Sequence, residues 1–115
     1  MTPSQLADKL EYRIINMDKT DEKQIAGPFC CDLLSLAMSR LPAGCAWVTV
    51  MANINTLAVA SLTDAACIVL AENAVLDDAA VSKACEQQIT VLCSDKPVFE
   101  TSLEIYEAVN DKAVL

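Results

Sequence analysis

Six cysteines and a complete absence of histidine limit the chemistry available to this chain of 115 residues. Serine–histidine and cysteine–histidine nucleophile pairs are excluded, and so is any zinc or haem site that needs an imidazole ligand. The two glycines, Gly27 and Gly44, form neither a Walker loop nor a dinucleotide-binding turn. We therefore expect a protein that is not an enzyme, with no catalytic residues, no metal site and no cofactor.

The one close pair of thiols is Cys30-Cys31, at the start of a segment with helical spacing of apolar residues. A helix N-terminus lowers the pKa of a nearby thiol, so this pair is compatible with a redox sensor. The pair lacks the CxxC spacing of redox motifs and iron–sulfur sites, and free cysteines most often pack in the interior. We favour packing for this pair, and more strongly for Cys67, Cys85 and Cys93, in a reducing compartment.

Polar side chains follow three apolar segments that have the composition of buried strands. In chain order they are Asn53 and Asn55, then Glu72 and Asn73, then Ser94 and Asp95. The carboxyl ends of parallel strands share one edge of a sheet, where ligands commonly bind, so these residues predict one groove. The alternative is that they only cap helices and turns. The acidic pair Glu72 and Asp95 disfavours bare phosphate and favours a neutral or metal-complexed ligand.

The elements that position these residues alternate along the chain. Strands are expected at 47–51, 67–71 and 89–93. The first helix between them is capped by Asn53 or Asn55, and the second is capped by Asp77. Continuous apolar strands joined by helices are typical of a parallel sheet covered on both faces. We expect an α/β fold, a three-layer sandwich with a mostly parallel sheet of about four strands flanked by helices.

The N-terminal part of the chain adds two helices and a strand. Thr2-Pro3-Ser4-Gln5 has the form of a capping box and predicts a helix to about Glu11. An edge strand of undetermined direction is expected at 12–17. Apolar residues recur at helical spacing over 29–41, which predicts a second helix.

A terminal helix is expected after the last strand. Pro97 suits the first helical position, and Phe99, Leu103 and Tyr106 are predicted to lie on the apolar face of this helix. The chain is expected to fray after Asn110.

The charge balance narrows the class of partner. Eight Lys and Arg against 16 Asp and Glu leave a net charge of −8, with the cations scattered, which excludes nucleic acid as a partner. No run of about 18 apolar residues is present, and the first residues do not have the pattern of a signal peptide. We expect a cytoplasmic protein with no membrane contact.

Four segments together resemble the DRTGG-domain family, above all its short stand-alone members from anaerobic bacteria. The resemblance extends over most of the chain, from about residue 28 to 109. The segments that carry it are Cys31-Asp32-Leu33-Leu34-Ser35, Trp47-Val48-Thr49-Val50-Met51-Ala52-Asn53-Ile54-Asn55-Thr56-Leu57-Ala58-Val59-Ala60, Cys67-Ile68-Val69-Leu70-Ala71-Glu72 and Ser94-Asp95-Lys96-Pro97-Val98-Phe99-Glu100-Thr101. Where the family's Asp-Arg-Thr-Gly-Gly string would fall, this sequence has residues 51–55. The resemblance implies one domain over 1–115, with an N-terminal helix and edge strand in 1–27 and a core in 28–110.

The resemblance also implies the fold of the N-terminal domain of HPr kinase/phosphorylase, an accessory, non-catalytic role, and six matching polar positions. Together with Glu72 and Ser94 from the strand ends, they make the candidate ligand-binding residues Asp32, Ser35, Asn53, Asn55, Glu72, Ser94, Asp95 and Thr101.

These observations favour a non-catalytic regulatory or ligand-sensing module that forms a homodimer and acts on a partner enzyme. Its expected ligand is a small molecule or a nucleotide-like compound. One alternative is an interaction protein docked through exposed apolar surface, and the family resemblance implies that it would be an accessory subunit of an anaerobic redox system of the hydrogenase type. Another is a redox sensor that uses Cys30 and Cys31.

Overall fold

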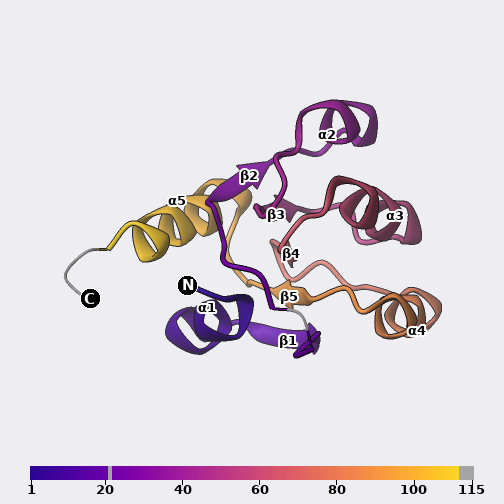
Figure 1. Ribbon diagram of the computed structural model, residues 1–115, viewed down its shortest axis with the longest axis horizontal. Helices are drawn as coiled ribbons and strands as arrows, with labels where there is room; N and C mark the ends of the chain where they lie inside the picture. The colour runs from indigo at the N-terminus through magenta and orange to yellow at the C-terminus, as the bar shows by residue number, and fades with distance from the viewer. Residues whose placement is uncertain (21, 112–115) are drawn as a thin grey trace.

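The computed structural model describes residues 1–20 and 22–111. The helices are α1 (Pro3–Leu10), α2 (Leu34–Arg40), α3 (Ile54–Thr63), α4 (Asp78–Gln87) and α5 (Val98–Val109). The strands are β1 (Arg13–Asn16), β2 (Pro28–Cys30), β3 (Ala46–Thr49), β4 (Cys67–Leu70) and β5 (Val91–Cys93). Figure 1 shows α2, α3 and α4 on one face of the sheet and α1 and α5 on the other, so the expected three-layer sandwich is confirmed.

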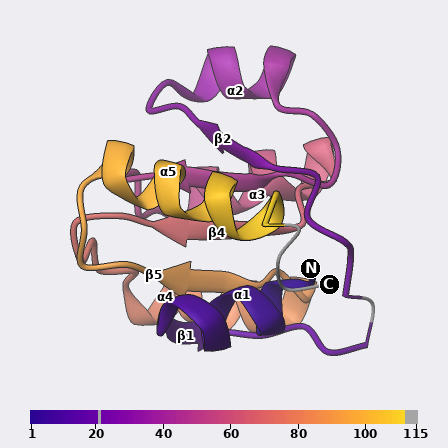
Figure 2. The same cartoon turned by 90° about the vertical axis from the view of Figure 1, so that its left-hand side faces the viewer.

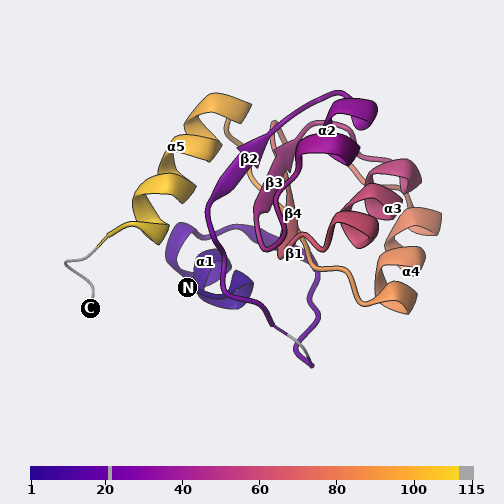
Figure 3. The same ribbon diagram turned by 45° about the horizontal axis from the view of Figure 1, so that its top comes forward.

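The strands form one sheet in the order β1-β5-β4-β3-β2. The four strands from β2 to β5 are parallel, and each lies beside the next one in the chain. The helices between them, α2, α3 and α4, lie side by side on one face (Figure 3). β1 is the edge strand expected at 12–17 and runs antiparallel to β5, with Arg13 opposite Cys93.

The sheet has one more strand than expected, because the helix predicted over 29–41 is wrong in its first part. Pro28–Cys30 pairs with β3, and α2 begins only at Leu34. The apolar residues of this segment fit helical spacing, but pairing with a distant strand overrides the local pattern.

The β2 edge is poorly suited to further strand pairing. Gly27 accepts from the Ala46 N–H and Cys31 donates to the Val48 carbonyl, so alternate residues direct their backbone at β3. The backbone of Pro28 and Cys30 therefore points to the open side, and proline has no N–H to offer there.

The core has two parts, one on each face of the sheet. Trp47, Ile68 and Leu70 pack toward the face of α2, α3 and α4, whereas Val48 and Val69 pack toward α1 and α5. All residues of β3, β4 and β5 are buried, which explains their continuous apolar composition. Figure 2 shows α1 and α5 lying across the second face.

The predicted apolar face of α5 is wrong. Phe99, Leu103 and Tyr106 are 70%, 44% and 57% exposed, while Thr101 and Ile105 are fully buried. The helix has an exposed nonpolar stripe and a separate buried face. Thr101 can lie on the buried face because its hydroxyl is hydrogen-bonded to the Ser94 hydroxyl beneath the helix.

Some of the other local predictions are confirmed and others are wrong. The capping box at Thr2 and the caps Asn53 and Asp77 are confirmed by their side-chain hydrogen bonds. Pro97 is the N-cap and not the first helical residue. Cys85, expected in the core, is exposed because its neighbour Ala84 takes the buried position on α4.

Two further expectations concern the C-terminus of the chain and the membrane. Fraying was expected after Asn110, and residues 112–115 lie outside the described residues. No helix in residues 1–20 and 22–111 is long and apolar enough to cross a membrane.

The two faces of α5 give a direct test of its orientation. We expect Ile105→Ala to lower the free energy of unfolding by about 3 kcal/mol, because it leaves a cavity under the helix. Leu103→Ala, on the same helix but exposed, should cost less than about 1 kcal/mol. Urea denaturation measures both. Equal losses, or a larger loss for Leu103→Ala, would contradict this packing.

Candidate functional site

The carboxyl ends of β3, β4 and β5 lie at one edge of the sheet, as the sequence indicates. The Ala71 N–H donates to Thr49, and the Ser94 N–H donates to Leu70, at 3.0 and 2.8 Å. β4 continues into α4 on one face, whereas β5 continues into α5 on the other face. The helices that follow these two adjacent strands therefore lie on opposite faces of the sheet.

Asp32 and Ser35 lie on the β2 side of this edge. The Asp32 carboxylate accepts hydrogen bonds from the buried Thr49 hydroxyl at 2.7 Å and from the Val50 N–H at 2.9 Å. It therefore closes the end of β3. Ser35 is exposed on the first turn of α2.

Asn53 and Asn55 lie at the start of α3. The Asn53 side chain accepts from the N–H groups of Asn55 and Thr56, as an N-cap does, and the Asn55 side chain is exposed. β4 separates β3, which precedes the asparagine loop, from β5, which precedes Ser94 and Asp95. These two strands are therefore about 10 Å apart.

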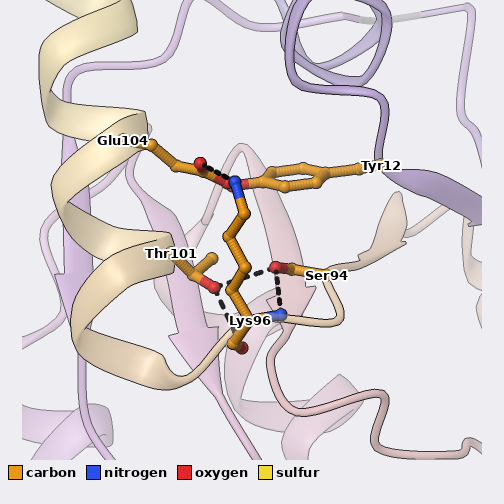
Figure 4. Close-up of polar contacts among 5 residues, drawn as sticks. All are labelled: Tyr12, Ser94, Lys96, Thr101 and Glu104. Carbon is orange, nitrogen blue, oxygen red and sulfur yellow. Dashed lines mark hydrogen bonds and ion pairs between the residues drawn. The ribbon is translucent and has the colours of Figure 1, made fainter.

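Ser94 and Thr101 form a buried hydroxyl pair that joins α5 to the sheet (Figure 4). Their oxygens are 2.9 Å apart, and the two residues are at most 2% exposed. Ser94 also accepts from the Lys96 N–H at 3.1 Å, and Thr101 donates to the Lys96 carbonyl at 3.2 Å. Every hydroxyl of this pair thus has a role in holding the turn before α5, a structural role in addition to the ligand role expected for both.

The loop after β4 is held against the loop after β5 by its backbone. Glu72 and Asn73 both have left-handed conformations, with φ of 58° and 54°. Their N–H groups donate to the carbonyls of Lys96 and Ser94, each at 2.9 Å. Two consecutive left-handed residues other than glycine are costly, and these two bonds compensate for that strain.

Glu104 on α5 links two side chains from different parts of the fold. Its carboxylate accepts from the Tyr12 hydroxyl at 2.6 Å and from the Lys96 ammonium at 2.5 Å (Figure 4). Tyr12 is 8% exposed and lies between α1 and β1. The three side chains tie the N-terminal segment, the loop after β5 and α5 together.

The ionisation of two of these groups is shifted. Burial, followed by the hydrogen bond to Glu104, raises the pKa of Tyr12 well above its usual value. The hydrogen bond to Glu104 also raises the pKa of the exposed Lys96 ammonium. At neutral pH the tyrosine is therefore neutral and the lysine charged, which is the donor arrangement that the Glu104 carboxylate needs.

A pocket of about 280 Å³ lies at this part of the edge. It is lined by residues of three segments that the chain order separates, namely Leu10, Glu11, Tyr12 and Arg13, then Asn73, then Cys93, Ser94, Asp95 and Lys96. Arg13 and Asp95 are exposed and make no ion pair within the described residues. The pocket thus offers the Arg13 guanidinium, which donates to the Cys93 sulfur at 3.5 Å, the exposed carboxylates of Glu11 and Asp95, and the amide of Asn73.

Of the eight candidate residues, Ser94 and Asp95 line this pocket, Thr101 lies beneath it, and Glu72 neighbours it in the loop after β4. Asp32, Ser35, Asn53 and Asn55 lie toward β2 and β3. That all eight serve one ligand stays a prediction.

Sequence reasoning missed the contribution of Tyr12 and Arg13 to the pocket. They enter because β1 runs antiparallel to β5, which brings the start of β1 to the carboxyl end of β5. The signal that was available is the apolar run at 12–17, but its direction could not be read from the sequence.

The six cysteines are free thiols. The packing expected for Cys30 is wrong, because this residue is exposed, whereas Cys31 packs against the core. Successive residues of an extended chain point to opposite faces. Both lie before α2 and not at its N-terminus. Burial raises the pKa of the Cys67 thiol to about 12, which makes it unreactive. The described residues hold no cluster of three or more cysteines and carboxylates suited to a metal ion.

The tyrosine at the pocket predicts a pH dependence. Because the pKa of Tyr12 is raised on folding, its stabilising effect is complete below the unfolded value of about 10 and is lost as the pH rises above it. We expect the Tyr12→Phe variant to be less stable than the native chain at pH 7 and to lose less stability between pH 9.5 and 11. Urea denaturation across this range checks it, with Tyr106→Phe as the exposed control. Parallel pH curves for the native chain and Tyr12→Phe would refute the assignment.

The fold is similar to a solved structure described as the CBS and DRTGG domains of the regulatory region of Clostridium perfringens pyrophosphatase, complexed with the activator diadenosine tetraphosphate. The TM-score is 0.73 at 10% sequence identity. The match covers 94% of this chain and 46% of that chain, so this chain spans just under half of that structure. No protein-family model and no curated protein matches the sequence. The chain thus has a DRTGG-like fold.

Proposed function

We propose that this chain is a non-catalytic regulatory module that senses a small ligand in the pocket between β1 and β5 and passes its state to a partner enzyme. The observation that carries this proposal is the pocket itself, which is lined by Arg13, Asn73 and Asp95. The two charged side chains, Arg13 and Asp95, make no ion pair among the described residues. Such a concave site with a few polar groups is what small-molecule recognition requires.

The size and charge of the pocket restrict the ligand. A volume of about 280 Å³ is at the lower end for ligand pockets, so it suits a small metabolite or one part of a larger molecule. Arg13 supplies a site for an anionic or carbonyl group, while Asp95 and Glu11 favour amine or hydroxyl donors. The structural neighbour was solved with a dinucleotide activator, which supports a nucleotide-like ligand as one candidate class.

A thermal-shift screen with a defined panel tests this function. The panel holds AMP, ATP with Mg²⁺, diadenosine tetraphosphate and the free amino acids. A ligand at about 100 times its Kd should stabilise the fold by about 2.7 kcal/mol and raise the melting temperature by several degrees. Arg13→Gln and Asp95→Asn should each weaken the binding of that ligand about tenfold, with Arg40→Gln on α2 as the matched control.

The Asn55→Ala variant extends the same experiment. If binding weakens in this variant too, the ligand reaches the asparagine loop, and the wider groove expected from the sequence is supported. If no compound in the panel raises the melting temperature of the native chain more than that of the Arg13→Gln variant, the ligand-sensing function is contradicted for the compound classes in the panel.

Self-association is a second property that a specific surface favours. Leu33, Val50 and Ile54 are exposed around the Asp32 bond at the β2 end of the carboxyl edge, and Leu36 is exposed on α2. Asp32 is the one charged residue among these positions, and its carboxylate is already bonded. An apolar patch with little charge suits contact with a second copy of an acidic chain.

Light scattering after gel filtration tests the homodimer. We expect a mass twice that of the 12.4 kDa chain, and a single-chain mass for Leu33→Glu. Leu62→Glu, on a 73% exposed position of α3, should leave the mass unchanged. A native chain of single mass at micromolar concentration would exclude the homodimer.

A further inference from the structure

The exposed face of α5 carries nonpolar side chains that the core does not use. Phe99, Leu103 and Tyr106 occupy positions i, i+4 and i+7, and together they form the α5 stripe. The buried face of the same helix is already filled by Thr101 and Ile105. The stripe therefore contributes less to the packing of this chain than the buried face does, and its exposure has a cost in solubility.

One side of the stripe is acidic. Glu100 and Glu107 are exposed and have no ion-pair partner within the described residues. On the same side, a groove of about 600 Å³ runs between α1 and α5. Its lining consists of Lys9 and Leu10 from α1, and of Glu104, Tyr106, Glu107, Ala108, Asn110 and Asp111.

The groove and the stripe are continuous, because Tyr106 belongs to both. Lys9, the cation of this lining, is bonded to Asp111 at 3.4 Å. The surface thus presents a nonpolar strip beside carboxylates, with its one lysine already neutralised.

We propose that the α5 stripe and the adjoining groove dock a basic amphipathic helix of a partner protein. Leucine-like side chains on one face of that helix would cover Phe99, Leu103 and Tyr106. Lysine or arginine side chains along its flank would meet Glu100 and Glu107. Helices bind grooves through anchors at i, i+3 or i+4 and i+7, which is the spacing that this stripe presents.

Charge complementarity selects this occupant over a second copy of the chain. The chain has a net charge of −8, and two copies of this surface would bring their glutamates together. A basic helix gains from the same carboxylates, which raise its rate of association. The stripe is also separate from the low-charge patch around Leu33, so the two surfaces can be tested independently.

A pair of synthetic helical peptides tests the docking surface. Both are about 18 residues long with leucines on one face, and lysines in one peptide are replaced by glutamates in the other. Binding of each fluorescein-labelled peptide to the intact chain is followed by fluorescence anisotropy at low and at physiological salt. We expect the lysine peptide to bind at least tenfold more tightly than the glutamate peptide.

Variants of the chain then locate the contact. Leu103→Ala and Tyr106→Ala should each weaken the lysine peptide about tenfold, as anchors do. Leu62→Ala, at an exposed leucine of α3, should change the affinity less than twofold. Glu100→Gln with Glu107→Gln should weaken binding at low salt and reduce its salt dependence. The urea measurement on Leu103→Ala confirms that this variant is folded.

Three results would overturn the proposal. The first is equal binding of the lysine and glutamate peptides. The second is an equal loss of affinity in Leu62→Ala and Leu103→Ala, since the contact would then lie elsewhere. The third is a dimer by light scattering that Leu103→Ala converts to a monomer, because the stripe would then contact a second copy. None of these results bears on the ligand pocket, which Arg13→Gln and Asp95→Asn test separately.

Discussion

The hydroxyl pair of Ser94 and Thr101 is the interaction on which the arrangement of this fold depends. It is buried where the chain leaves β5 and turns to the face opposite α4. Without partners, two buried hydroxyls would each be costly, so each makes the position of the other favourable. Because α5 is fixed there, Glu104 lies within reach of Tyr12 and Lys96, and the start of β1 is held beside the end of β5. The pocket exists because these segments meet.

Much of the sheet could be predicted from local sequence. Three apolar segments indicate β3, β4 and β5 because buried parallel strands need no polar side, and caps such as Asn53 and Asp77 act within a few residues. Pro28–Cys30 escaped prediction because a strand of three residues exists only through its pairing with β3. The orientation of α5 escaped for a related reason, since nonpolar periodicity cannot show that the buried residue is Thr101 with a partner in Ser94.

The candidate site shows the same division. Parallel strands share an edge whatever their side chains, so the placement of Ser94 and Asp95 at that edge followed from the pattern. Neither the order of strands across the sheet nor the direction of β1 is encoded locally. The distance of Asn53 from this pocket and the entry of Tyr12 and Arg13 into it both follow from those two properties.

The low-charge patch and the acidic surface lie on different parts of the fold. The proline at the edge of the sheet adds a separate consequence for assembly. Edge strands are the usual route by which α/β and β proteins polymerise or fuse their sheets. Here Pro28 removes a donor that such growth would need at β2. A contact made at the β2 edge must consequently rely on side chains, which can be specific and reversible, more than on an open-ended ladder of peptide groups.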